Sequence, residues 1–277
     1  MYTKPMRENN FETITENIQA RAISVNAENY VVMANDMVRG TSGLSLNEAK
    51  LLRLIIMQVR KDDKQFFKFK IRTDEFANLL QIDKSNLYRE MDKMSTHLLK
   101  EVIRIGDGNP RHKWKKFQWI SYCEYDEGVL TIRLNDELAP YILGLQEYYT
   151  QYRLEEIVGF RSTYSLKIYE MINLGLMGRK PHADKKYCVY VSLAEIRRAT
   201  NTEDKFERIS QFKAKVIDIS VKDINKYSPY HVTVEDFKES RSIVGFYFLV
   251  ESQSGFEYRK SLETKQMELG DYLDENN

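Results

Sequence analysis

Two stretches of the chain, residues 66–134 and 187–250, follow one plan, and this repetition constrains the fold more than any other feature. Each stretch opens with a short run typical of a β-strand, Phe66–Ile71 in the first and Tyr187–Val191 in the second. Each then shows a short helix signal, a polar turn, a longer amphipathic helix and two further strand-like runs. This is the order of a winged helix-turn-helix. The sequence therefore predicts an α+β protein of two tandem winged helix-turn-helix domains related by internal duplication.

The length of 277 residues is sufficient for two domains, each with its own core. We expect a flexible N-terminal arm over residues 1–28, a first winged-helix domain over 29–145 and a second over 146–256. An acidic C-terminal tail follows over 257–277, and its last fifteen residues hold five acids and one lysine. A solvated chain end is the plain interpretation of this tail, and an interaction tail is the alternative.

The net charge of +1 is unevenly distributed. Residues 29–262 hold 38 bases against 32 acids, a mild basic excess that permits nucleic-acid binding without proving it. No apolar run approaches the roughly 20 residues of a membrane span, and the N-terminus lacks the apolar segment of a secretory signal. Cys123 and Cys188 are expected as buried free thiols rather than as a disulfide. A cytoplasmic protein with no membrane partner is the expectation.

The first domain has a supporting helix and a candidate recognition helix. Ser45 with Glu48 three residues later matches a capping box at the start of the supporting helix. The candidate recognition helix runs from Ser85, its expected N-cap, to about residue 99. Opposite its apolar seam lie Ser85, Arg89 and Lys93, which can meet phosphates and base edges. An ordinary solvated helix face is the alternative.

A basic hairpin is expected to be the wing of the first domain. The turn signal Gly106–Pro110 separates the strand-like runs Val102–Ile105 and Lys115–Tyr122. On the tip and its flank, the candidate contacts to the DNA backbone are Arg111, Lys113 and Lys115. A strand edge protected from aggregation by lysines is the alternative.

The long helix signal from about Lys205 to Tyr227 is the clearest amphipathic element. Its apolar side chains occupy an arc of about 160° on a helical wheel. The candidate DNA-binding residues of this segment are Lys205, Arg208, Gln211, Lys213, Lys215 and Lys222. Lys213 falls toward the apolar arc. Arginine and lysine can pair with guanine or phosphate and glutamine can read adenine, so this stripe favours DNA contact.

Motifs for catalysis are absent from the sequence. There is no phosphate-binding Gly-x-x-x-x-Gly-Lys-Ser/Thr stretch and no Gly-x-Ser-x-Gly. The four histidines are scattered, and two cysteines cannot form a structural zinc site. We therefore expect no enzymatic activity, no cofactor and no metal.

Three parts of the sequence resemble the iteron-type plasmid replication initiators, a family of tandem winged-helix Rep proteins. The stretches that carry the resemblance are Tyr30–Met37 followed by Leu44–Glu48, Arg161–Met171, and Phe212–Ile217 with Asp223–Asn225. The second of these is similar to the family's Ser-x-Tyr-Ser-x-x-Leu/Ile-Tyr-Glu helix, which is a fairly specific motif. The resemblance as a whole extends over about residues 29–251.

The resemblance implies a replication initiator that binds directly repeated origin DNA, called iterons, through both domains. It also implies a homodimer, paired mainly through the first domain, that represses its own promoter. Host replication proteins, such as the helicase or the chromosomal initiator, are the implied partners. The second domain would supply most of the sequence-specific contact, here through Arg208, Gln211, Lys213 and Lys215.

Two other functions compete with this interpretation. A dedicated transcriptional repressor could use the same fold, and sequence does not separate it from an initiator. A nicking initiator of rolling-circle replication would be an enzyme with a metal-binding histidine pair and a tyrosine nucleophile. The histidine pair is missing from the sequence.

Overall fold

The computed structural model describes residues 20–23, 29–80, 87–107, 109, 111–182 and 185–257. The first part of the chain forms β1 (Ala20–Ala22), β2 (Tyr30–Ala34), α2 (Asn35–Val38), α3 (Leu46–Met57), β3 (Lys68–Arg72), α4 (Thr73–Leu80), α5 (Leu87–Lys100), β4 (Val102–Gly106), β5 (Trp114–Gln118), β6 (Ile120–Asp126) and β7 (Val129–Leu134). The second part forms η2 (Asp136–Leu138), α6 (Ala139–Ile142), β8 (Tyr149–Arg153), α7 (Glu155–Val158), α8 (Thr163–Leu176), β9 (Tyr187–Ser192), α9 (Leu193–Ala199), α10 (Ile209–Phe212), η3 (Lys213–Ile217), α11 (Asp218–Tyr227), β10 (Tyr230–Glu239) and β11 (Ser242–Ser252).

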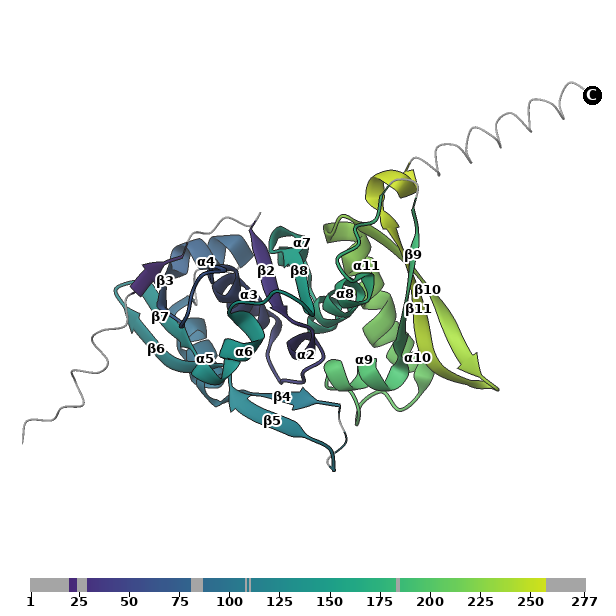
Figure 1. Cartoon of the computed structure of the whole chain (residues 1–277), viewed down its shortest axis with the longest axis horizontal. Helices are drawn as coiled ribbons and strands as arrows, with labels where there is room; N and C mark the ends of the chain where they lie inside the picture. Colours follow the sequence, from purple (N-terminus) through teal and green to yellow (C-terminus); the bar gives the residue numbers. More distant parts are fainter. Residues whose placement is uncertain are drawn as a thin grey trace, which may run out of the picture.

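Two units of the chain share one topology (Figure 1). The first consists of β3, α4, α5 and the hairpin β6–β7, in a sheet of order β1-β3-β7-β6. The second consists of β9, α9, the helix α10–α11 and the hairpin β10–β11, in a sheet of order β10-β11-β9. In both, the last hairpin strand pairs antiparallel with the strand that precedes the first helix. The prediction of two winged helix-turn-helix domains in an α+β chain is confirmed.

The wing of the first domain is not the hairpin expected from the sequence. The strand-like run 115–122 is broken at Trp119, whose side chain is only 1% exposed. The residues before this break pair with β4, and those after it pair with β7. The wing is therefore β6–β7, and its turn carries Asp126 and Glu127 in place of the expected cations.

The basic hairpin β4–β5 is instead an insertion between α5 and the wing. Figure 1 shows it along the lower edge, with its tip toward α9 of the second domain. Arg198 of α9 donates a hydrogen bond to the carbonyl oxygen of Asp107. Thr41 forms an isolated antiparallel bridge to Arg104 on β4, and its hydroxyl donates to the carbonyl oxygen of Arg198 over 3.1 Å. These contacts fix the hairpin against the second domain.

Part of the N-terminal arm belongs to the sheet of the first domain. Ala20–Ala22 pairs in parallel with β3, where the sequence predicts a loose arm. Arg21 fastens this strand because its guanidinium donates to both carboxylate oxygens of Asp63, over 2.8 and 2.9 Å. The same guanidinium lies 4.2 Å from the centre of the Phe67 ring. Residues 1–19 and 24–28 lie outside the described residues, as do residues 258–277 of the acidic tail.

The cysteine prediction is half correct. Both cysteines are free, and Cys123 is partly buried. Cys188 is exposed, because it lies on the outward face of β9, an edge strand of its sheet. No helix of the described residues is both long and apolar enough to cross a membrane.

α3, β2, β8 and α8 pack together beside the two winged-helix units. β2 pairs antiparallel with β8, which joins the start of the folded chain to its middle. The capping box predicted at the start of α3 is confirmed, since Ser45 N donates to Glu48 Oε2 over 2.7 Å and Glu48 N to Ser45 Oγ over 3.4 Å. α3 then packs on α8, the helix with the Tyr-Ser-x-x-x-Tyr-Glu motif.

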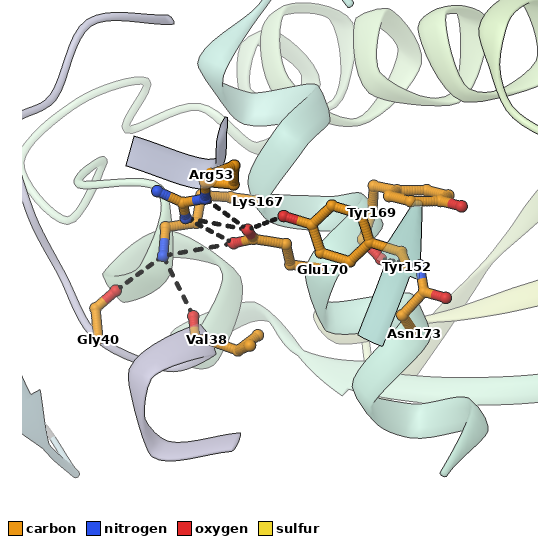
Figure 2. A network of polar contacts seen from close by, with 8 residues as sticks. All are labelled: Val38, Gly40, Arg53, Tyr152, Lys167, Tyr169, Glu170 and Asn173. Carbon is orange, nitrogen blue, oxygen red and sulfur yellow. Dashed lines mark hydrogen bonds and ion pairs between the residues drawn. The ribbon is translucent and has the colours of Figure 1, made fainter. Parts of the chain in front are cut away.

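A buried ion pair ties the two helices together (Figure 2). Arg53 of α3 donates to both carboxylate oxygens of Glu170 on α8, over 2.9 and 3.1 Å. Tyr152 of β8 donates to Glu170 Oε1 over 2.7 Å. Arg53 is 1% exposed and Glu170 is fully buried. A buried charge keeps its ionised form only when its partners replace water, and here α3, α8 and β8 supply the partners.

Two buried lysines cross the same junction in opposite directions. Lys50 of α3 donates to the carbonyl oxygens of Val158 and Phe160, over 2.6 and 2.8 Å. Lys167 of α8 donates back to carbonyl oxygens of the first domain, at residues 38 and 40, over 3.2 and 3.1 Å. Burial lowers the pKa of each lysine to about 8, and a nearby carboxylate, Asp223 for Lys50 and Glu170 for Lys167, opposes this shift.

Candidate nucleic-acid interface

The second helix-turn-helix begins with a well-capped first helix. Ser192 and Glu195 form a reciprocal capping box at the start of α9. The turn that follows is organised by Arg197. Its guanidinium donates to the carbonyl oxygens of Thr202, Lys205 and Phe206, over 2.9, 2.7 and 2.9 Å. Arg197 thus acts as a scaffold of the turn.

Arg197 also joins the turn to the recognition helix. Its guanidinium lies 4.4 Å from the centre of the Phe212 ring, and Phe212 is fully buried on α10. The turn includes Asn201 and Phe206 in the left-handed backbone region, at φ of 53° and 54°. Residues other than glycine rarely adopt this backbone conformation, because it is strained. The three hydrogen bonds from Arg197 to the turn offset the strain. The sequence analysis missed Arg197, because its partners are carbonyl groups that no residue pattern reveals.

Replacing Arg197 by lysine is expected to lower the free energy of unfolding by about 1–3 kcal/mol. A single ammonium cannot replace a planar group that holds three carbonyl oxygens and packs flat on a ring. Urea denaturation followed by circular dichroism measures the effect. Arg241→Lys, on the exposed wing tip, is the matched control and should change stability by less than about 0.5 kcal/mol. Equal stability of the two variants would show that Arg197 does not hold the turn.

The recognition helix begins later than the sequence predicts and contains an irregular turn. It starts at Ile209, so Lys205 lies in the preceding turn and Arg208 is the N-cap residue. Lys213–Ile217 forms a π-helical turn between α10 and α11. Such turns are rare, and they rotate the residues that follow relative to a regular helix.

Lys213 is engaged by the wing of its own domain. Its ammonium lies 2.6 Å from Asp236 Oδ1 on β10, and its side chain is about one-third exposed. The pair joins the recognition helix to the wing. The position of Lys213 toward the apolar arc, noted in the sequence, agrees with this contact.

The other candidate residues of the second domain face solvent. Arg208, Gln211 and Lys215 are exposed around the N-terminal half of the recognition helix, and Lys205 and Lys222 are exposed on either side of it. Within the described part of the chain, none of the four cations among them forms an ion pair. The wing tip adds two more exposed cations, Lys238 and Arg241, which the sequence analysis did not select. This surface can receive a polyanion without first breaking internal pairs.

The first recognition helix, α5, is less cationic. Arg89 and Lys93 are exposed, and both lie beside Glu90, with N–O distances of 3.9 and 3.5 Å. Ser85 lies outside the described residues. Tyr88 is 68% exposed and meets Tyr125 of the wing edge-on, with ring centres 5.9 Å apart. Aromatic and mixed-charge groups therefore dominate this face.

The cations expected on the first wing lie on the inserted hairpin. Arg111, Lys113 and Lys115 are exposed on its tip and on β5. They do not adjoin the wing β6–β7. The tip is held beside α9, and the structure thus gathers these cations toward the second domain.

The motif on α8 positions the recognition helix. Ser165 donates to Asp223 Oδ2 of α11 over 2.7 Å, and both side chains are buried. The backbone N–H of Arg161 donates to the same oxygen over 2.8 Å. Glu170, five residues further along the motif, is bound to Arg53 of the first domain. One helix therefore contacts both the recognition helix, through Ser165, and α3, through Glu170.

Topology and surface charge together define a tandem winged-helix protein. Residues 30–173 match the family described as initiator replication protein, WH1, and residues 192–250 match the family described as initiator Rep protein, WH2. The WH1 match alone spans more than half of the chain, and the chain belongs to this family of replication initiators. The family resemblance found in the sequence is thereby confirmed.

Similar proteins agree with this assignment. A replication initiation protein of Escherichia coli is 26% identical over 255 residues, which is 88% of this chain and 76% of that protein. The crystal structure of the Pi initiator protein in complex with iteron DNA superposes with a TM-score of 0.66 at 21% identity. That match covers 83% of this chain and 99% of the Pi chain, so the two proteins share the fold over nearly all of Pi.

Proposed function

We propose that this protein initiates plasmid replication by binding directly repeated origin DNA, the iterons, through its two winged-helix domains. The observation that carries the proposal is the group of unpaired, exposed cations around the second recognition helix, above all Arg208 and Lys215. Family membership supports the role in replication. The bound DNA of the similar Pi initiator supports the iteron as the ligand.

In this proposal the second domain, over residues 146–256, reads base edges with Arg208, Gln211 and Lys215. Lys205, Lys222 and the wing tip contact phosphates. Lys213 positions the wing through Asp236. The first domain, over residues 29–145, contributes Arg89 and Lys93, together with Ser85, and weaker electrostatic contact.

The inserted hairpin adds Arg111, Lys113 and Lys115 to the phosphate contacts near the second domain. Dimerisation, repression of the protein's own promoter and recruitment of host helicase or initiator belong to the same proposal. The protein would act in the cytoplasm, without a cofactor and without catalysis.

Nuclease footprinting on the DNA that flanks the protein's own gene tests the function. We expect several protected blocks at a regular spacing, since each repeat would bind one protein molecule. A single protected palindrome would identify a repressor instead. Plasmid maintenance after deletion of the gene provides the second readout, because an initiator is required for persistence and a repressor is not. Strand cleavage of supercoiled plasmid in the presence of Mg²⁺ or Mn²⁺ would contradict the non-enzymatic mechanism.

A further inference from the structure

A cleft of about 1090 Å³ lies at the junction of the two domains. Its walls come from β2, β8, α7, the C-terminal end of α8 and the loop after it, and the ends of α11, β10 and β11. No lining residue comes from α5, α9, α10 or η3, so the cleft is separate from the proposed DNA surface. The nucleic-acid interface does not account for this cleft.

Large apolar and aromatic side chains are exposed in this cleft. Tyr148 is 81% exposed and Met177 is 80% exposed, the two highest values among the large hydrophobic side chains described. Tyr149 and Tyr30 line the same cleft at 37% and 36% exposure. Exposed apolar groups gathered at one concave place mark a binding surface rather than random surface composition.

The cleft is lined by four cationic side chains and by two acidic ones, Glu155 and Glu156, of which Glu155 is paired with Arg153. Among the described residues, Arg39, Arg179 and Lys180 line it without an ion-pair partner. Lys180 donates to the Tyr30 hydroxyl over 3.3 Å. Hydrogen bonds from Arg153 and Lys180 lower the pKa of Tyr30, which agrees with a positive potential at this wall. The surface therefore suits an acidic peptide with apolar and aromatic side chains.

The chain itself supplies such a peptide close to the cleft. Ser252, the last residue of β11, lines the cleft, and the described chain ends five residues later at Glu257. The following sequence contains the apolar and aromatic side chains of Leu269, Tyr272 and Leu273. Five acids and one lysine accompany them within residues 263–277. Charge and apolar character are thus complementary to the cleft.

We propose that residues 263–277 dock in cis into the cleft between the two domains, with their carboxylates toward Arg39, Arg179 and Lys180. The five residues between Glu257 and this segment can span up to about 20 Å, and the cleft wall starts at Ser252. A tether this short gives an effective concentration of the order of millimolar, so even weak contacts suffice for docking. The tail then acts as an internal ligand of the domain junction.

Photocrosslinking in the full-length protein tests the docking without DNA. Tyr272 is replaced by p-benzoylphenylalanine, the protein is irradiated, and crosslinked peptides are identified by mass spectrometry. We expect crosslinks within one chain to the peptides that contain Tyr148 or Met177. The yield should fall several-fold between about 0.05 and about 0.5 M salt, because added salt screens the pairing of exposed charges.

Charge reversal supplies the controls. Arg179→Glu with Lys180→Glu should reduce the yield at least about fivefold. Asp271→Lys with Asp274→Lys, which leaves the folded domains unchanged, should do the same. Combining both pairs should restore the crosslink. Lys61→Glu with Lys64→Glu, on an exposed loop outside the cleft, should leave it unchanged.

Three results would overturn the proposal. Crosslinks confined to other surfaces would show that the tail does not occupy the cleft. Crosslinks between two chains would identify the tail of a second copy as the occupant. An undiminished yield after the tail reversal would show that charge does not direct the contact. Each result is independent of the proposed replication function, which footprinting decides separately.

Discussion

Changing Glu170 to glutamine is expected to lower the free energy of unfolding by about 3–5 kcal/mol. The substitution preserves the shape of the side chain but removes the only carboxylate that Arg53 contacts in the described structure. Lys167, whose ammonium lies 3.8 Å from Glu170 Oε2, loses its nearest counter-charge as well. Two buried cations would then remain unpaired. Equilibrium urea denaturation, followed by circular dichroism, measures the loss.

An exposed ion pair provides the control for this experiment. Arg72 and Asp74 lie 3.2 Å apart with side chains that are 62% and 49% exposed. Asp74→Asn should therefore leave the free energy of unfolding nearly unchanged, because water screens this exposed pair. The double variant Arg53→Met with Glu170→Leu should be more stable than Glu170→Gln, because it removes both buried charges together. A loss for Glu170→Gln no larger than the control would show that the pair does not hold the junction.

Replacement of Arg208 or Lys215 by alanine is expected to weaken binding to the origin repeats by about 1–3 kcal/mol each. This corresponds to a decrease in affinity of about 5- to 150-fold. Neither side chain has an ion-pair partner within the described residues, so neither loss is offset by release of an internal carboxylate. Fluorescence anisotropy with a labelled repeat, over a range of salt concentrations, measures the affinity and its salt dependence.

The effects of a substitution on sequence discrimination and on salt dependence show whether the lost side chain contacts a base or a phosphate. If the removed side chain reads a base edge, the variant discriminates less between the repeat and a scrambled duplex. If the removed side chain contacts phosphate, binding to both duplexes weakens equally. The slope of log affinity against log salt concentration then falls by about one. Lys61→Ala, on an exposed loop of the first domain, is the matched control. Unchanged affinity in both variants would show that the second recognition helix is not part of the DNA interface.

The sequence predicted both helix-turn-helix units because their signals are local. Apolar periodicity marks α5 and α11, and the capping box at Ser45 is set by residues three positions apart. The first wing could not be predicted in the same way. Trp119 interrupts a run with strong β propensity, and only the distant pairing of β6 with β7 shows where the strand ends.

In the candidate site, too, local patterns could be predicted from the sequence and distant contacts could not. Arg208, Gln211 and Lys215 could be chosen because the solvent-facing side of an amphipathic helix is visible in the sequence. The π-helical turn within Lys213–Ile217 was not visible, since the apolar pattern there is that of a regular amphipathic helix. Arg53 and Glu170 are 117 residues apart, and no pattern connects positions at that separation.

The fastening of α3 to α8 has a consequence for the target of the protein. With Arg53 and Glu170 joined, the two reading modules sit at one distance and one mutual rotation. A double helix completes a turn in about 10–10.5 base pairs, so each inserted base pair turns one half of a site by about 35° relative to the other. Under the proposed mode of DNA binding, the protein would therefore be sensitive to helical phase, and the buried Arg53–Glu170 pair would set the spacing of DNA that it accepts.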